Sequence, residues 1–102
     1  MKILNSPLIS VIVPCFNSGR TIKRTILSIK KQTWAKKEII LVNDGSTDGL
    51  TLNTLKELGE EKIVKLVNQE NNGLASARNK GVNQSSGIFL FFLDADDWIE
   101  PR

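Results

Sequence analysis

Four apolar runs divide the chain and predict four β-strands. They cover residues 9–13, 38–42, 62–67 and 88–93. The first, second and fourth runs are almost uninterrupted, which is typical of strands that are buried on both faces of a sheet. The third run alternates polar and apolar residues, so we expect that strand at an edge of the sheet, with one face exposed.

The segment after the first strand has the periodicity of an amphipathic helix. Its apolar stripe lies opposite a row of basic residues and consists of Ile22, Ile26 and Ile29. We expect Ser18 to cap the start of this helix. Its end should fall near Gln32, with Trp34 covering that end.

Two more helices are expected between the later strands. Leucines mark a short second helix, which Asp48 is expected to cap and Gly59 to close. A stripe of small and apolar residues over 74–82 marks the third and would let that helix approach the sheet closely. Strands that alternate with helices predict one α/β domain over residues 1–102, with a three-layer, doubly wound, mostly parallel sheet.

Polar residues follow the first, second and fourth strands, and in a parallel sheet these positions meet at one edge. The crevice of a doubly wound sheet opens where the strand order reverses, which we expect between the first and fourth strands. Phe16 and Asp94 would flank that crevice, so a base can lie against the ring while a metal-bridged phosphate reaches the carboxylate. Clustered carboxylates such as Asp94 and Asp96 favour Mg²⁺ or Mn²⁺. The alternative is that these acids cap a turn and face water.

Charge and composition exclude several classes of site. The chain has no histidine and a single cysteine, Cys15, so imidazole chemistry, a Cys/His zinc site and an internal disulfide are excluded. Cys15 is expected to be a small buried side chain in a protein from a reducing compartment. The net charge is +3, and residues 1–37 carry eight Lys/Arg and no acid. We interpret this basic third as the solvated face of one helix plus a loop, with nucleic acid or an anionic membrane surface as the alternative partner.

Known nucleotide fingerprints are missing, but four motifs resemble one family. There is no Gly-X-Gly-X-X-Gly after the first strand and no Gly-Lys-Ser/Thr. The four motifs are VIVPCFN over 11–17, VNDGSTD over 42–48, GLASARNKG over 73–81 and FLDADD over 92–97. In order and spacing, from about Leu8 to the end, they resemble the Rossmann-like, nucleotide-binding half of a family 2 glycosyltransferase with the GT-A fold.

The resemblance implies a base site on the first two motifs. Asp44 would accept a hydrogen bond from the imide N–H of uracil. Phe16 stands where the family often has tyrosine; it can stack on the base but lacks the hydroxyl. The backbone of Pro14 would contact the nucleoside, and Asn17 belongs to the same nucleotide-binding set.

The resemblance also implies a diphosphate site on the last two motifs. Asp94 and the backbone of Ala95 would lie near ribose and diphosphate, and Asp96 would bind the Mn²⁺ or Mg²⁺ that bridges the phosphates. Arg78 would approach the diphosphate or orient the acids around it. Asp97 is expected to be a cap or an acid behind the metal ligand.

The activity implied is an inverting hexosyl transfer from a nucleoside-diphosphate sugar, with a UDP-sugar favoured, to an acceptor saccharide or lipid-linked saccharide. An inverting transfer needs a general base, which the family places well beyond the Asp-X-Asp motif. Glu100 is the only later acid and lies too close to that motif. We therefore expect a donor-binding portion without a catalytic base, inactive alone; the alternative is a non-catalytic nucleotide-binding module.

The environment of the protein follows from the same features. The apolar stretch at the start of the chain is too short, and turns polar too soon, for a secretory signal. We therefore expect a cytoplasmic protein, either free in the cytoplasm or at the cytoplasmic face of the membrane. Nucleic acid is not an expected partner. An acceptor half normally packs on this sheet, so exposed apolar surface and a homodimer are expected.

Overall fold

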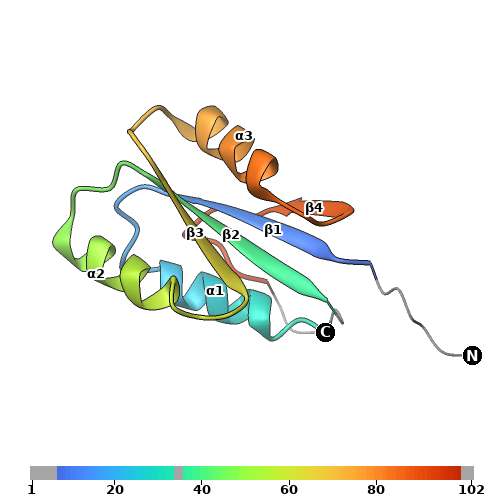
Figure 1. Ribbon diagram of the computed structural model, residues 1–102. Coiled ribbons are helices and arrows are strands. Elements are labelled where there is room, and N and C mark those ends of the chain that lie inside the picture. The colour runs from blue at the N-terminus through green and yellow to red at the C-terminus, as the bar shows by residue number, and fades with distance from the viewer. Residues whose placement is uncertain (1–6, 34–35, 100–102) are drawn as a thin grey trace, which may run out of the picture.

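The computed structural model describes residues 7–33 and 36–99, which form a sheet of four parallel strands with three helices (Figure 1). The strand order is β3-β2-β1-β4. The strands are β1 Ile9–Cys15, β2 Lys37–Asp44, β3 Val64–Gln69 and β4 Phe89–Phe92. The α/β class and the edge position of the third strand are therefore confirmed. The strand order reverses between β1 and β4, also as predicted.

The helices cover both faces of the sheet, which gives the three predicted layers. They are α1 Ile22–Lys30, α2 Gly49–Leu58 and α3 Leu74–Gln84. Figure 1 shows α1 and α2 on one face and α3 on the other, and the buried side chains form two clusters accordingly. Because successive residues of a strand point to opposite faces, Val11 belongs to the α1/α2 cluster and Ile12 to the α3 cluster.

The two central strands carry most of the core. The residues from Val11 to Val13 in β1 and from Ile39 to Val42 in β2 are all apolar, and none of them has exposed surface. Burying each such aliphatic side chain contributes about 1.5–3 kcal/mol before entropy is counted. On the α3 side the approach is close, since a Cβ added to Gly81 would lie 2.4 Å from Cγ2 of Ile12. The predicted close packing of the third helix is thus observed.

The prediction that the fourth strand is buried on both faces is wrong. The four residues of β4 are all exposed, from 39% for Phe91 to 57% for Phe89, and the preceding Ile88 is 76% exposed. In the described part of the chain β4 pairs only with β1 and forms the second edge of the sheet. Apolar periodicity indicates a strand that is made to be covered on both faces. It does not indicate which part of a protein supplies the cover.

The ends of the first two helices differ in how well they were predicted. Thr21, and not Ser18, is the N-cap of α1; the Ser18 hydroxyl instead donates to the carbonyl of Phe16, at 3.0 Å. The helix ends at Lys30, two residues before the expected end, and Trp34 lies outside the described residues. Asp48 does cap α2, because its carboxylate accepts from the backbone N–H of Thr51 at 3.1 Å, and Gly59 closes that helix.

The basic side of α1 faces solvent next to α2. Lys23 pairs with Glu57 at 3.0 Å, and Lys30 pairs with Glu61. These pairs neutralise part of the basic face, which agrees with a solvated helix surface. Among the described residues, no helix has the length and apolar character that a bilayer span requires.

Candidate functional site

Three loops meet at the carboxyl ends of β2, β1 and β4, because β1 lies between the other two strands. This edge holds every polar motif that the sequence singled out after a strand. Ligands of open parallel sheets bind at such an edge, at the point where strand order reverses. The loops here build two adjoining features: a small pocket next to Asp44 and an acidic loop over residues 94–97.

The pocket has a volume of about 280 Å³ and a largely apolar lining. Its walls come from the ends of β1 and β2 and from the start of α3, and they consist of Pro14, Cys15, Phe16, Asp44, Asn71, Gly73, Leu74 and Ala77. Phe16 is 48% exposed, so its ring is accessible to a ligand. The pocket therefore combines a planar apolar ring with one buried carboxylate, which suits a planar heterocycle that carries an N–H donor.

The carboxylate of Asp44 is held by three donors from the end of β3 and the segment that follows it. Its Oδ1 accepts from Nε2 of Gln69 at 2.7 Å and from the backbone N–H of Asn72 at 2.8 Å; its Oδ2 accepts from the backbone N–H of Gly73 at 3.1 Å. A carboxylate can accept about four hydrogen bonds, so Oδ2 keeps one acceptor position. Burial alone would raise the pKa of Asp44, but the three hydrogen bonds outweigh it and hold that pKa below its ordinary value.

Backbone geometry brings the loop after β2 against the loop after β3. Gly45 has a positive φ of 72°, and a Cβ there would lie 2.5 Å from the backbone nitrogen of Asn71. The side chain of Asn71 donates to the carbonyl of Asp44 at 2.9 Å. Sequence reasoning missed Gln69, Asn71 and Asn72. A signal was present, since a run of amide side chains follows an edge strand.

Asn17 holds two neighbouring loops together, and Cys15 is a buried member of the pocket wall. Asn17 is not among the residues that line the pocket; its Oδ1 accepts from the backbone N–H groups of Thr47 at 2.9 Å and Asp48 at 3.0 Å. It thus ties the end of β1 to the loop that starts α2. Burial raises the pKa of the Cys15 thiol, which therefore stays protonated at neutral pH and is no nucleophile.

The acidic loop brings three carboxylates together. Oxygens of Asp94, Asp96 and Asp97 all lie within 4.8 Å of one another, and Asp96 and Asp97 are exposed. The backbone N–H of Asp97 donates to the carbonyl of Asp94 at 3.0 Å, which closes a turn. An all-oxygen donor set of this kind fits Mg²⁺ or Mn²⁺. Asp97, expected to be a cap or an acid behind the metal ligand, belongs to the same cluster of carboxylates as Asp96.

Side chains at the start of α1 hold the acidic loop through hydrogen bonds to its backbone carbonyls. The hydroxyls of Thr21 and Thr25 lie 2.8 and 2.9 Å from the carbonyl oxygen of Ala95, and both can donate to it. Arg24 donates to the carbonyl of Asp96 at 3.3 Å. Sequence reasoning also missed these residues. The available signal was two threonines four positions apart, since they lie on the inward side of a helix whose other inward residues are mainly isoleucines.

Arg78 of α3 contacts the acidic loop. Its Nη2 lies 3.3 Å from Oδ1 of Asp94, whereas its Nε is buried and has no hydrogen-bond partner in the described part of the chain. The preceding residue, Ala77, lines the pocket. An ion pair this exposed stabilises a fold by only about 0–1 kcal/mol. Its more significant feature is that it places a guanidinium against the cluster of three carboxylates.

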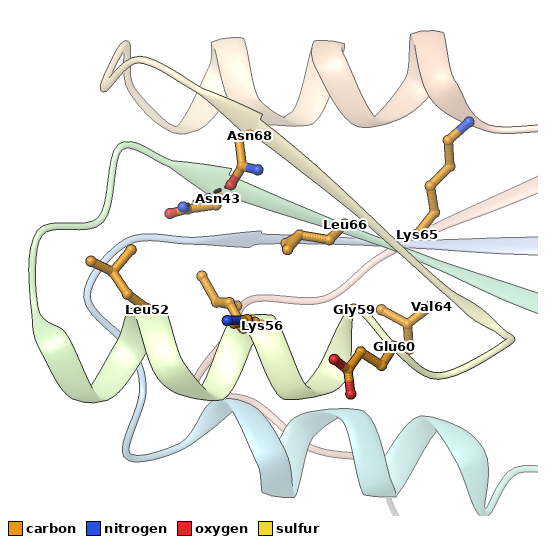
Figure 2. Close-up of a pocket in the computed structure, with 10 residues that line it drawn as sticks. Asn43, Leu52, Lys56, Gly59, Glu60, Val64, Lys65, Leu66 and Asn68 are labelled. Carbon is orange, nitrogen blue, oxygen red and sulfur yellow. Dashed lines mark hydrogen bonds between the residues drawn. The ribbon is translucent and has the colours of Figure 1, made fainter.

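A larger groove of about 600 Å³ lies between α2 and β3 (Figure 2). Figure 2 shows Lys56 and Glu60 on its helix side and the hydrogen-bonded pair Asn43 and Asn68 at one end. No residue of the acidic loop lines this groove, and neither Asp44 nor Phe16 does. We place the functional site at the smaller pocket, because the polar groups converge there.

Acid titration should reveal the hydrogen bonds to Asp44. Its pKa is lowered in the folded state, so its contribution to stability is complete above the ordinary carboxyl pKa of about 3.9 and is lost as the pH falls through the folded pKa. We expect urea denaturation of the parent to lose stability more steeply below about pH 4 than that of Asp44→Asn, whose side chain does not titrate. Parallel pH profiles for the two proteins would contradict this role.

Comparison with known proteins identifies the family. The family model of glycosyl transferase family 2 matches residues 10–102. WfgD of Escherichia coli, a UDP-Glc:alpha-D-GlcNAc-diphosphoundecaprenol beta-1,3-glucosyltransferase, is 40% identical over 96 residues, which are 93% of this chain and 38% of WfgD.

Solved structures agree with that match. The mannosyltransferase PcManGT from Pyrobaculum calidifontis, in complex with GDP-Man and Mn²⁺, superposes with a TM-score of 0.82 at 30% identity, over 90% of this chain and 28% of that one. S. aureus TarS in complex with UDP gives a TM-score of 0.78 at 35% identity, over 88% of this chain and 28% of that one. The expected GT-A type of fold is thereby confirmed. The chain spans a minor part of the length of each of these relatives, and it belongs to glycosyl transferase family 2.

Proposed function

We propose that the chain binds a nucleoside-diphosphate sugar together with a divalent cation, as the donor-binding portion of an inverting hexosyltransferase. One observation carries this proposal: the pocket that holds Asp44 and the acidic loop that holds Asp96 lie at the same edge of the sheet, and Arg78, which follows the pocket-lining Ala77, contacts Asp94 of that loop. A base, a diphosphate and a metal ion need such a succession of apolar, cationic and anionic surroundings.

Base recognition rests on Asp44 and Phe16. An ionised carboxylate only accepts hydrogen bonds, so the acceptor position left on Oδ2 selects a base with an imide or amide N–H. Uracil and guanine present such a donor, whereas the corresponding ring nitrogen of cytosine is an acceptor. The apolar lining beside Phe16 provides a surface for stacking. A UDP-sugar remains the favoured donor.

Charge at the acidic loop determines how the diphosphate is held. Three carboxylates alone repel a diphosphate, and the guanidinium of Arg78 offsets only part of that repulsion. Asp96, with Asp94 beside it, would hold Mn²⁺ or Mg²⁺; when bound, such a cation acts as a Lewis acid on the phosphate oxygens. Arg78 adds a fixed positive charge where the leaving diphosphate develops negative charge. The carbonyls of residues 95–97 stay anchored to α1, so the ligand geometry is preorganised.

The relatives support the donor and suggest the acceptor. PcManGT is described with GDP-Man and Mn²⁺, TarS with UDP, and WfgD by a diphosphoundecaprenol acceptor. By analogy we propose an acceptor saccharide or lipid-linked saccharide, reached at the cytoplasmic face of a membrane. A second copy of the chain is a further partner that we propose.

The catalytic base is not assigned to any residue between 7 and 99. The acids at this edge of the sheet are committed to the metal position or, like Asp44, to backbone donors. This observation keeps a non-catalytic nucleotide-binding module as the second candidate. A labelled nucleotide-sugar donor incubated with mixed acceptors should give no transfer by this chain alone on either candidate. Transfer would rule out the non-catalytic module and would require a catalytic group within this chain, with Glu100 and Asp97 the first to test.

Calorimetry with nucleoside diphosphates tests the binding proposal directly. We expect UDP to bind more tightly with Mn²⁺ than without it, and CDP to bind at least about tenfold more weakly than UDP, because a mismatched donor and acceptor leave Asp44 unpaired. GDP is an informative third ligand, since guanine also carries an N–H donor. Absence of UDP binding in the presence of Mn²⁺ would refute the proposed function.

A further inference from the structure

The backbone at Asn17, directly after the pocket residue Phe16, has an unusual conformation. Asn17 has a φ of +51°, and in the described part of the chain it is the one residue other than glycine with a positive φ. Asparagine tolerates this left-handed region better than most residues do, but the surrounding structure still has to hold it there. The conformation at Asn17 sets the direction in which the chain leaves the pocket wall at Phe16.

The side chain of Asn17 holds this conformation against the loop after β2. Its Oδ1 accepts from the backbone N–H groups of Thr47 at 2.9 Å and Asp48 at 3.0 Å, and its Nδ2 donates to Oγ1 of Thr47 at 3.4 Å. Its own backbone N–H donates to Oγ of Ser46 at 3.0 Å. Four hydrogen bonds therefore join one residue of the first loop to three consecutive residues of the second.

The partners of Asn17 are themselves fixed by the framework behind them. Ser46 is buried, and its backbone N–H donates to Oδ1 of Asn43 at 2.9 Å. Nδ2 of Asn43 donates in turn to Oδ1 of Asn68 on β3 at 3.0 Å. Asp48 is the N-cap of α2. The loop after β1 is thus tied through Asn17 to both neighbouring strands and to a helix.

Phe16 depends on these ties because it is held along the chain from both sides. Cys15 before it is the last residue of β1 and is buried. Asn17 after it is anchored to the second loop, and the hydroxyl of Ser18 donates to the carbonyl of Phe16 at 3.0 Å. The Phe16 ring itself is half exposed. The position of the ring therefore rests on the backbone that carries it.

We propose that Asn17 is a positioning residue of the base pocket, which fixes the backbone that presents the Phe16 ring to a nucleobase and does not itself contact the nucleotide. The inference rests on the proposed function, since it takes the Phe16 ring as the stacking surface. A ring that is already oriented binds a base more tightly, because a mobile one loses conformational entropy on binding. In agreement with an indirect role, Asn17 is outside the pocket lining.

The chemistry of this position predicts which replacements preserve its role. Glycine adopts the same φ without strain but offers no acceptor to the two backbone N–H groups. Alanine lacks the acceptor and is also strained at a positive φ. Aspartate tolerates the left-handed region and accepts from both N–H groups, so it should substitute for asparagine. The three variants separate the hydrogen bonds of the side chain from the conformation of the backbone.

Amide hydrogen exchange of the ligand-free chain tests whether Asn17 holds the two loops together. In Asn17→Gly and Asn17→Ala the amides of Thr47 and Asp48 lose their acceptor and should exchange about 3- to 10-fold faster, the effect of one hydrogen bond. Asn17→Asp should retain the exchange rates of the parent. Asn83→Ala is the matched control, since Asn83 is an exposed asparagine of α3 outside the pocket lining and this network.

Titration with UDP and with pyrophosphate, both in saturating Mn²⁺, tests whether these ties serve the base site. The quantity measured is the ratio of the two affinities, because pyrophosphate lacks a base. We expect the ratio to fall about 5- to 30-fold in Asn17→Gly, the effect of freeing the backbone of one residue. Asn17→Asp and Asn83→Ala should keep the ratio of the parent. Circular dichroism checks folding, and the glycine variant provides the test even where Asn17→Ala does not fold.

The parent protein separates failure of this inference from failure of the proposed function. A parent that binds no UDP in the presence of Mn²⁺ refutes the proposed function, and the inference falls with it. If the parent does bind UDP, two results overturn the inference alone. One is unchanged amide exchange in Asn17→Gly, which together with a lower affinity ratio would mean that Asn17 contacts the nucleotide directly. The other is an unchanged ratio, including equal losses for UDP and pyrophosphate.

Discussion

Replacing Asp96 with alanine is expected to abolish the mutual enhancement of Mn²⁺ and UDP binding. In the parent, each ligand should raise the affinity for the other by the same factor, because a cation converts the repulsion between the acidic loop and a diphosphate into attraction. Couplings of this kind amount to about 5- to 150-fold. Calorimetric titration of UDP, with and without saturating Mn²⁺, measures the factor in parent and variant.

Asp97→Ala is the matched comparison and should retain most of the coupling. The two carboxylates are both exposed and lie within the same cluster, so the substitutions remove equal charge from nearly the same place. The backbone of Asp97 stays anchored, since its N–H donates to the carbonyl of Asp94 and its own carbonyl lies within hydrogen-bond distance of the Thr25 hydroxyl. A larger loss in Asp97→Ala would identify Asp97 as the metal ligand instead. UDP affinity indifferent to Mn²⁺ in the parent would remove the metal from the proposal.

The position of the site could be predicted from the sequence because its chemistry follows the strands directly. Asp44 ends the second strand and Asp94 comes two residues after the fourth, and a parallel sheet brings such positions to one edge. The reversal of strand order between β1 and β4 then places the acidic loop beside the pocket at Phe16. These conclusions needed only local patterns and one topological rule.

The parts that could not be predicted depend on contacts between distant segments. Gln69 and Asn72 hold the carboxylate of Asp44 from 25 and 28 residues away. Thr25 reaches the carbonyl of Ala95 across 70 residues. Amide and hydroxyl side chains of this kind form no periodic pattern. The exposure of β4 was mispredicted for a different reason. An apolar run indicates that a strand is suited to burial on both faces, but it does not indicate which segment packs against those faces.

These long-range bonds also explain why the polar residues of the site occupy such fixed positions. A carboxylate that accepts three bonds from one segment cannot rotate without leaving a backbone N–H unpaired. Gly45 closes the same arrangement from the other side, since a side chain there would collide with Asn71. The candidate base pocket is therefore preorganised in part by residues outside its lining, namely Gly45, Gln69 and Asn72. Preorganisation of this kind lowers the entropy that binding must overcome.

Replacing Asp44 with asparagine is expected to weaken UDP binding about 10- to 100-fold, the loss associated with one hydrogen bond to a charged group. The amide keeps one acceptor oxygen and presents an NH₂ group where the carboxylate accepted. In place of Oδ2 that group faces the N–H of Gly73 and the imide of uracil, and in place of Oδ1 it faces Nε2 of Gln69 and the N–H of Asn72; all of these groups are donors. The free energy of unfolding should also fall by about 1–3 kcal/mol, because a backbone N–H loses its acceptor.

Pyrophosphate separates a base-reading role from a general loss of structure. It lacks a base, so its affinity in the presence of Mn²⁺ should be nearly the same in parent and Asp44→Asn while that of UDP falls. The preference for UDP over CDP should shrink in the variant, since an amide NH₂ can donate to the ring nitrogen of cytosine. Equal losses for UDP and pyrophosphate would move Asp44 out of the base site. They would leave it a purely structural residue that fixes the loop of residues 69–73.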